Sequence, residues 1–491
     1  MTNSTIDVSN AYSQENEAAW ISNKWDQWDN QRETWKQGIS ELNKYLYATD
    51  TTTTTNQSLP WKNSTTLPKL TQIMDNLHSN YISSIFPNDK WLLWEAHDKD
   101  SANKEKVKNI TAYMENKTRL GGFRQKVSEL LMDFIKGNSF STISFEKRHN
   151  LHEDTNTIVP TFIGPKAVRI NPYDIVFNPT VANFEDSPKI IRSLKSIGEL
   201  LTLAESNPEQ MFWKDVVQDH LDKGVKIAGA KSDEQEKRDQ YMVDGFGSLD
   251  EYYNGEMIEI LEFYGDYYDK VTNELHKNRM ITIAGRSYVA RNISIQTYGG
   301  QAPIFHSGWR TRPDNLWAMG PLENLVGMQY RIDHLENLKA DAMDLIVHPP
   351  LKIIGEVEEF QWGPNSVIHI DENGDVQEIS KSLNSIVIAD NQIAELEERM
   401  ELYAGAPREA MGVRSPGEKT KFEVSTLQNA AGRIFQEKVT HFEITTLEPL
   451  LNAMFEISVR NFDGSDIVSV LDKDLGSKTF LENTANDITA K

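Results

Sequence analysis

The chain has 491 residues, enough for about three domains at roughly 150 residues each. Hydrophobic residues make up 38% and charged residues 25%, a balance that supports packed cores and excludes a disordered chain. The formal net charge of −22 argues against capture of duplex nucleic acid by an overall basic surface. Because the chain has no cysteine, thiolate catalysis, cysteine-ligated metals and disulfides are excluded.

No segment resembles a membrane span or a secretion signal. The N-terminal residues lack the basic and apolar regions of a signal peptide, and no stretch approaches the roughly 18 uncharged apolar residues of a membrane span. We therefore expect no membrane contact by this chain.

The N-terminal part is predicted to be helical. Residues 13–47 carry apolar residues mostly at spacings of three, four or seven, which places them on one helical face: Trp20, Trp25, Trp28, Trp35, Ile39, Leu42 and Leu46. Pro68 begins a second helix with a similar face: Leu70, Ile73, Met74, Leu77, Tyr81 and Ile85. Two more helices are expected to end at Gly121-Gly122 and at Gly137.

From Ser139 the pattern changes to short strands. The predicted strands are Ile143–Lys147, Ala167–Ile170, Asp174–Phe177, Ile258–Tyr264 and Met280–Ile283. The charged residues 231–240 between the two groups are expected to be exposed. The first 320 residues are thus predicted to form helices packed on small antiparallel sheets.

A long helix is predicted from Pro321 to about Val347, ended by His348-Pro349-Pro350. Its apolar stripe begins with Leu325, Met328, Ile332 and Leu335, and Lys339 interrupts it further along. The other faces are rich in carboxylates. The stripe indicates a single packing seam, which identical subunits in a ring would bury between them.

A small β insert follows the prolines, with Asn373-Gly374 as a strong hairpin signal between apolar runs. Asp390 is the predicted N-cap of a helix that Gly405 ends. Another helix starts near Thr420, runs to about Leu447 and is followed by a last helix. Beyond Gly464 the pattern assigns no packed role.

The loop between these helices, residues 405–419, is basic in an acidic chain. Its candidate DNA-contacting residues are Arg408, Arg414, Lys419 and, just inside the next helix, Lys421. Repeated around a ring, they would form a positive collar that holds phosphates loosely. The alternative is that they pair with Glu409, Glu418 and neighbouring acidic residues at a subunit interface.

Two glycine-containing motifs resemble nucleotide-binding patterns and fail. Gly412–Thr420 approaches the phosphate-binding pattern GxxxxGK[ST], but the additional Glu418 displaces the lysine. Residues 245–250 lack the third glycine of a dinucleotide fingerprint. Both are interpreted as turns or loops.

Two candidate metal motifs also fail. The residues around Asp371 and Asn373 resemble a calcium loop, but Ser382 stands where a glutamate is needed. His149 and His152 lack a third ligand at suitable spacing and lie in a predicted hairpin tip. We therefore expect no metal, no cofactor and no enzymatic activity.

The order of elements is specific in residues 60–462. Met319-Gly320-Pro321 precedes the long helix, and a β insert, a second helix and residues 404–461 follow, while residues 163–179 and 258–269 lie upstream. This order resembles the portal protein, or head-tail connector, of a tailed, short-tailed bacteriophage. The resemblance implies a helix-rich α+β portal fold with wing, stem, clip and tunnel loop.

The resemblance divides the chain into portal regions. They are the wing at 1–320, the first stem helix at 321–347, the clip at 348–387, the second stem helix at 388–404, the tunnel loop at 405–419, a long wing helix and following helix at 420–462, and a segment toward a crown at 463–491. In the clip, Phe360 and Trp362 are the expected interface anchors, with a local core as the alternative.

The resemblance also implies partners and a location. It implies a ring of twelve subunits at one capsid vertex, which passes double-stranded DNA without sequence specificity during packaging and ejection. The expected partners are the major capsid protein, the terminase large subunit and a tail adaptor protein, and the expected location is the virion, with host cytoplasm during assembly. The alternatives are a metal-dependent hydrolase of nucleic-acid or phosphate metabolism and a helical scaffold without a channel.

Overall fold

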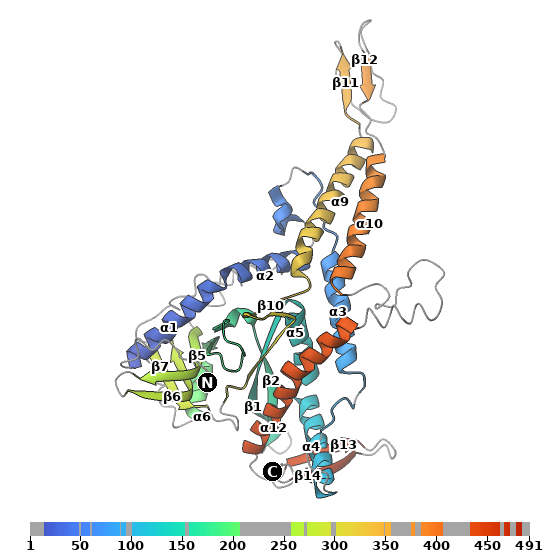
Figure 1. The fold of residues 1–491 in the computed structure, drawn as a ribbon. Coiled ribbons are helices and arrows are strands. Elements are labelled where there is room, and N and C mark those ends of the chain that lie inside the picture. Colours follow the sequence, from blue (N-terminus) through green and yellow to red (C-terminus); the bar gives the residue numbers. More distant parts are fainter. Residues whose placement is uncertain are drawn as a thin grey trace.

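The computed structural model describes residues 14–48, 51–58, 61–88, 90–94, 101–152, 157–206, 257–269, 273–295, 301–347, 349–354, 375–378, 384–405, 433–461, 466–471 and 478–483. The chain is a mixed α+β structure, about half helical, with several antiparallel sheets. Figure 1 shows a body of helices and sheets from which a pair of long helices extends.

The predicted N-terminal helices are confirmed. They are α2 (Glu33–Leu46), α3 (Lys69–Ile85), α4 (Ser101–Leu120) and α5 (Phe123–Ile135), preceded by α1 (Gln14–Gln31). The six apolar residues expected on one face of α3 are all buried. Residues 51–58 form two short 3-10 helices, Thr51–Thr53 and Thr55–Ser58.

Helices α1 and α2 are separate, whereas the periodicity predicted one continuous apolar face. The break lies at Arg32, whose buried guanidinium donates hydrogen bonds to the carbonyl oxygens of Pro172 (2.6 Å), Tyr173 (2.6 Å) and Ile175 (2.7 Å). Asp29 accepts from Arg32 Nε (2.8 Å) and from Lys36 Nζ (2.8 Å). A buried ionic network thus joins the N-terminal helices to the 3-10 helix Pro172–Asp174 and to the first residue of strand β3 (Ile175–Phe177).

The larger sheet has the order β3-β4-β5-β6-β7 and is antiparallel throughout. Its strands are β3 (Ile175–Phe177), β4 (Lys189–Ser196), β5 (Met257–Asp269), β6 (Glu274–Ala284) and β7 (Tyr288–Ser294). Trp20 and Trp25 of α1 pack on the face of β5 that carries Phe263, while α6 (Ile197–Ser206) packs on the face that carries Ile260. Consecutive strand residues point to opposite faces, so α1 and α6 cover the two sides of this sheet.

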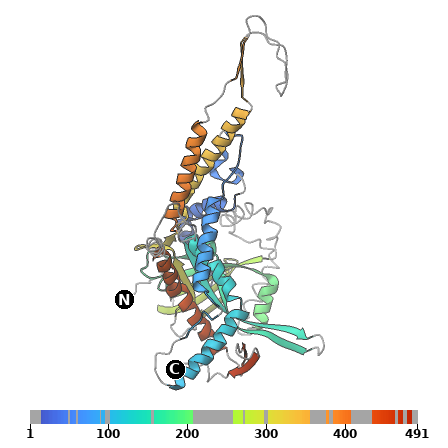
Figure 2. The same ribbon diagram turned by 90° about the vertical axis from the view of Figure 1, so that its right-hand side faces the viewer.

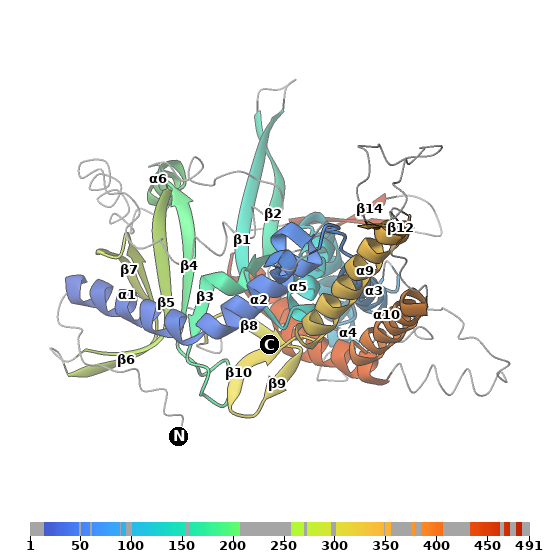
Figure 3. The same ribbon diagram turned by 90° about the horizontal axis from the view of Figure 1, so that it is seen from above.

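The second sheet has the order β2-β1-β8. Its strands are β1 (Asn138–His152), β2 (Thr157–Ile170) and β8 (Ile304–Gly308). The predicted strands Ile143–Lys147 and Ala167–Ile170 are parts of β1 and β2, which are both much longer. Helices α5 and α12 pack on this sheet (Figure 3).

The chain then enters the long helices through the hairpin of β9 (Arg310–Arg312) and β10 (Asn315–Met319). A short 3-10 helix (Glu323–Leu325) leads into α9 (Val326–Val347), which confirms the predicted long helix with a later start. Strands β11 (Leu351–Ile354) and β12 (Asp375–Glu378) pair at the far end, and α10 (Asn384–Tyr403) returns toward the body. The expected Asn-Gly hairpin lies mostly outside the described residues, and β11 is the observed partner of β12.

Residues 433–442 are helical and continue through a π-helical turn (Glu443–Leu447) into α12 (Glu448–Arg460). The predicted boundary between two helices near Leu447 therefore coincides with a change from π-helical to α-helical geometry. Strands β13 (Asp466–Leu471) and β14 (Lys478–Asn483) pair antiparallel, so the segment without an assigned role contains a hairpin beside α4.

A substitution at Gly320 is expected to destabilise the junction between body and α9. A Cβ at Gly320 would lie 2.7 Å from the Ile135 carbonyl oxygen and 2.8 Å from the Lys136 carbonyl carbon. Gly320→Ala should therefore lower the free energy of unfolding by about 1–3 kcal/mol in chemical denaturation. Gly327→Ala is the matched control, because nothing lies within 4 Å of its added Cβ. Helix propensity predicts a gain of about 0.5–1 kcal/mol there, so equal losses in both variants would contradict the steric argument.

Candidate functional site

The candidate site is the pair of antiparallel helices α9 and α10, called here the helical hairpin. Figures 1 and 2 show that it extends away from the body and carries the β11–β12 ribbon at its tip. Lys339, which interrupts the apolar stripe in the sequence, joins the two helices because its Nζ lies 3.0 Å from Asp390 Oδ1. Helix α10 starts at Asn384, so Asp390 lies inside this helix. The prediction that Asp390 is its N-cap was wrong.

The predicted subunit seam lies in the core of the chain itself. Leu325, Ile332 and Leu335 are 1%, 0% and 8% exposed, and Met328 is partly buried against the same core. That core also contains residues of α2, α3 and α10, including Met400. Side chains already covered by their own subunit are not available to a neighbour. Leu325, Ile332 and Leu335, predicted to form a subunit seam, therefore lie in the core of one chain, and Met328 packs against that core.

A second, polar stripe on α9 holds an extended segment, residues 62–67, against the helix. Asn337 Oδ1 accepts a hydrogen bond from Thr65 N (2.8 Å), and Asn337 Nδ2 donates to Thr65 O (2.9 Å). Gln329 Nε2 donates to Leu67 O (2.6 Å), and Asp341 Oδ1 accepts from Asn63 N (3.1 Å).

The spacing of this polar stripe explains the contact. Gln329, Asp333, Asn337 and Asp341 recur every four residues, or about 6.0 Å along a helix. Two residues of an extended chain span about 6.6 Å. Side chains on successive turns of α9 can therefore form hydrogen bonds with the backbone of every second residue in the extended segment. The backbone of a neighbouring β-strand would form hydrogen bonds with the same spacing.

Asp333 is the most buried carboxylate of this stripe, with 0% exposure. Its Oδ1 accepts hydrogen bonds from Leu67 N (3.1 Å) and Gln329 Nε2 (2.9 Å), while its Oδ2 has no partner among the described residues. Burial raises the pKa of Asp333 to about 7, and the two hydrogen bonds only partly oppose this rise. The side chain is thus half protonated near neutral pH.

The helical hairpin exposes apolar side chains along both of its helices. These side chains, called here the outer apolar residues, are Leu338, Met343 and Val347 of α9 and Val387, Ile388, Leu402 and Tyr403 of α10. Each is between 44% and 67% exposed. Ile353 and Ile354 of β11 are also exposed. Solvent-facing apolar residues concentrated on a projecting element are typical of an interaction surface.

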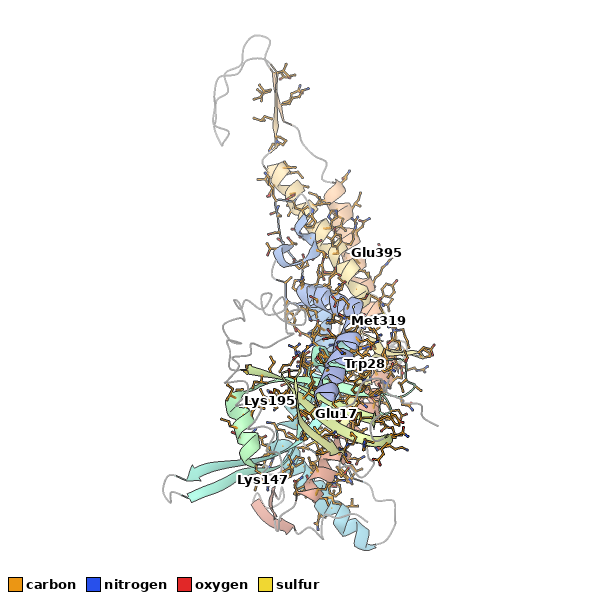
Figure 4. The ribbon with its side chains drawn as sticks, turned by 90° about the vertical axis from the view of Figure 1, so that its left-hand side faces the viewer. Glu17, Trp28, Lys147, Lys195, Met319 and Glu395 are labelled. Carbon is orange, nitrogen blue, oxygen red and sulfur yellow. The ribbon has the colours of Figure 1, made fainter. Side chains whose placement is uncertain are left out.

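The same two helices are acidic. They carry nine carboxylates and three basic side chains, and exposed carboxylates such as Glu395 lie along α10 (Figure 4). Buried Lys69 is paired with Glu401 (2.5 Å), which holds the base of α10 to the start of α3. The hairpin therefore combines a rigid attachment, an acidic surface and exposed apolar residues.

The other predicted site residues lie outside the described residues. These are Arg408, Arg414, Lys419, Lys421, Phe360 and Trp362. Within the described ranges, no group of three or more His, Asp or Glu side chains is placed to hold a metal ion. No helix in the described part of the chain has the length and apolar character needed to cross a membrane.

Sequence reasoning missed the polar stripe and the outer apolar residues. The stripe has a signal, because amide and acid residues recur at intervals of four from Gln329 to Asp341. The outer apolar residues have none, because periodicity cannot tell which apolar residues of a helix are covered. Comparisons of the sequence with protein-family models and with curated proteins find no match.

Proposed function

We propose that this chain is one subunit of a bacteriophage portal ring that conducts double-stranded DNA. The observation that carries the proposal is the helical hairpin, which stands out from an α+β body and exposes apolar residues along both of its helices. Val347, Ile388 and Leu402 are 67%, 59% and 63% exposed in a single subunit. A closed ring would bury such residues between identical neighbours, whereas a monomer leaves them in water.

The proposal places the subunit contact on the outer apolar residues, in place of the buried stripe of α9. The stripe and the polar contacts to residues 62–67 fix each hairpin rigidly to its own body. A rigid hairpin loses little conformational freedom when a neighbour binds. The entropic cost of ordering the hairpin therefore opposes association only weakly.

The acidic character of the hairpin fits passage of DNA. If these helices line a channel, their carboxylates repel the phosphate backbone, and DNA slides instead of binding. Residues 405–419 follow α10 directly, so the basic residues Arg408, Arg414 and Lys419 are the proposed loose contact to phosphates. Residues 348–387, which include the β11–β12 ribbon, are the proposed contact to the terminase large subunit and the tail adaptor, and the body would meet the major capsid protein.

The mass of the native assembly tests the proposal. Purified protein should give a ring-shaped particle of about 670 kDa, twelve times the 56.0 kDa chain, in native mass spectrometry and negative-stain microscopy. A monomer or dimer at micromolar concentration would contradict it. Metal-dependent hydrolysis of DNA or a phosphate ester by a small oligomer would favour the hydrolase instead.

A further inference from the structure

Arg331 of α9 is an exposed basic residue that makes no ion pair with any residue the structure describes. The other two basic residues of the helical hairpin are paired within the chain. Lys339 lies 3.0 Å from Asp390, and Arg399 lies 2.5 Å from Glu395. The two helices also carry nine carboxylates. An exposed guanidinium on this element is therefore available to a carboxylate of another molecule.

Glu398 of α10 lies at the same height along the helical hairpin as Arg331. The ion pair between Lys339 and Asp390 fixes how the two antiparallel helices are aligned, and Figures 1 and 2 show them side by side. Arg331 is eight residues before Lys339, and Glu398 is eight residues after Asp390. Both are thus about 12 Å nearer to the body than that ion pair.

Arg331 and Glu398 nevertheless do not meet within one hairpin. Successive residues of an α-helix are about 100° apart, so Glu398 lies about 160° around α10 from Met400, which is 0% exposed. Glu398 therefore points away from the core, and it makes no ion pair with a described residue. On α9, Arg331 and Asp333 lie on opposite sides of buried Ile332. Arg331 is thus on the side of α9 that residues 62–67 do not cover.

Exposed residues continue both positions along the two helices. The α9 face, as we call it, consists of Gly327, Arg331 and Leu338, and the α10 face consists of Asn391, Glu398 and Leu402. The steps are four and then seven residues in α9, and seven and then four in α10, so each set stays on one side of its helix. Because the helices are antiparallel, each residue of the α9 face has a residue of the α10 face at its own height.

We propose that the α9 face of one copy packs against the α10 face of the next copy, with Arg331 paired to Glu398 of that neighbour. Rotation about an axis parallel to the hairpin keeps every residue at its height, so ring neighbours bring these two side chains to one level. Leu402, which is 63% exposed, then lies against Gly327, where an added Cβ would have nothing within 4 Å. The inference rests on the proposed ring and adds to it a direction and a register.

The ion pair would select this register more than it would strengthen the contact. A partly exposed ion pair contributes little to affinity, whereas like charges placed opposite each other are strongly unfavourable. A slip of the two faces by one heptad would place Arg331 opposite Asn391 or Gly405, and Glu398 opposite Asn324 or Leu338. Neither charge would then have a partner, so the correct register is favoured over its nearest equivalents.

Exchange of the two charges tests this contact. Arg331→Glu or Glu398→Arg alone should raise the subunit concentration at half-assembly on the order of tenfold, because every interface then opposes like charges. The double variant should return to within about threefold of the natural chain, because each pair is restored with its charges exchanged. Lys277→Glu makes the same change of net charge as Arg331→Glu at an exposed position of β6, and should assemble normally. Circular dichroism should show unchanged melting for all four variants.

An equimolar mixture of the two single variants gives a second readout of the same contact. In a ring where the variants alternate, every interface pairs opposite charges, so native mass spectrometry should show rings that contain both variants in equal numbers. Single variants that lose assembly without recovery in the double variant or the mixture would overturn the pairing of Arg331 with Glu398.

The natural chain separates this contact from the proposed ring. Normal assembly of Arg331→Glu would overturn the contact and leave the ring standing. A small oligomer or open chain whose association follows the charge exchange would support the contact and overturn the ring. A natural chain that stays monomeric would overturn both.

Discussion

Ile388→Asp is expected to abolish the ring while leaving the subunit folded. Ile388 is 59% exposed in one subunit, so a carboxylate there stays hydrated and costs the fold little. In the proposed ring the same carboxylate is buried without a partner at every interface, at a cost of several kcal/mol each. Native mass spectrometry should therefore show monomer, and circular dichroism should show unchanged melting.

Two further variants serve as controls for this prediction. Gln392→Glu adds the same charge at an exposed polar position of α10, and it should still assemble. Leu335→Asp places a charge in the chain's own core, where the side chain is 8% exposed, and should cost about 4 kcal/mol or more in folding. Normal rings from Ile388→Asp would remove the outer apolar residues from the proposed interface.

The helices of the body could be predicted from the sequence because their signals are local. In α3, the six apolar residues from Leu70 to Ile85 recur at helical spacing, and all of them are buried. Gly122 and Gly137 adopt positive φ angles of 69° and 127°, which explains why both glycines mark boundaries.

The elements that cover each apolar face could not be predicted. The periodicity of apolar residues shows which side of a helix is apolar, but not which other element packs against that side. The stripe of Leu325, Ile332 and Leu335 was correctly identified as apolar and wrongly assigned to a neighbouring subunit. Its covering residues come from α2, α3 and α10, far away in the sequence. The same limit applies to Asp390, whose type suits an N-cap but whose observed partner is Lys339 on another helix.

The polar stripe of α9 shows a second limit. A helix with an amide or acid at every fourth position normally faces water, and such a pattern alone indicates a solvated face. Here those side chains meet the backbone of residues 62–67, which has its own hydrogen-bonding groups to satisfy. Only the three-dimensional structure brings this distant extended segment to the helix.

Asp333 makes the stability of this contact depend on pH. The unfolded chain releases the Asp333 proton near the ordinary pKa of 3.8, whereas the folded chain keeps it until its pKa of about 7. Between these values the unfolded state binds fewer protons, so the contribution of Asp333 to the free energy of unfolding falls as pH rises, and it stays constant above pH 7. About three pKa units at about 1.4 kcal/mol each give a total change of about 4 kcal/mol.

Asp333→Asn removes this titration and can still accept the hydrogen bonds from Leu67 and Gln329. Relative to the natural chain, the variant should gain up to about 4 kcal/mol in the free energy of unfolding between pH 4 and pH 7. Urea unfolding of both proteins at pH 4.5, 5.5, 6.5 and 7.5 measures the difference between their free energies of unfolding at each pH. A constant difference between Asp333→Asn and the natural chain across this range would show that the Asp333 carboxylate is ionised in the fold despite its burial.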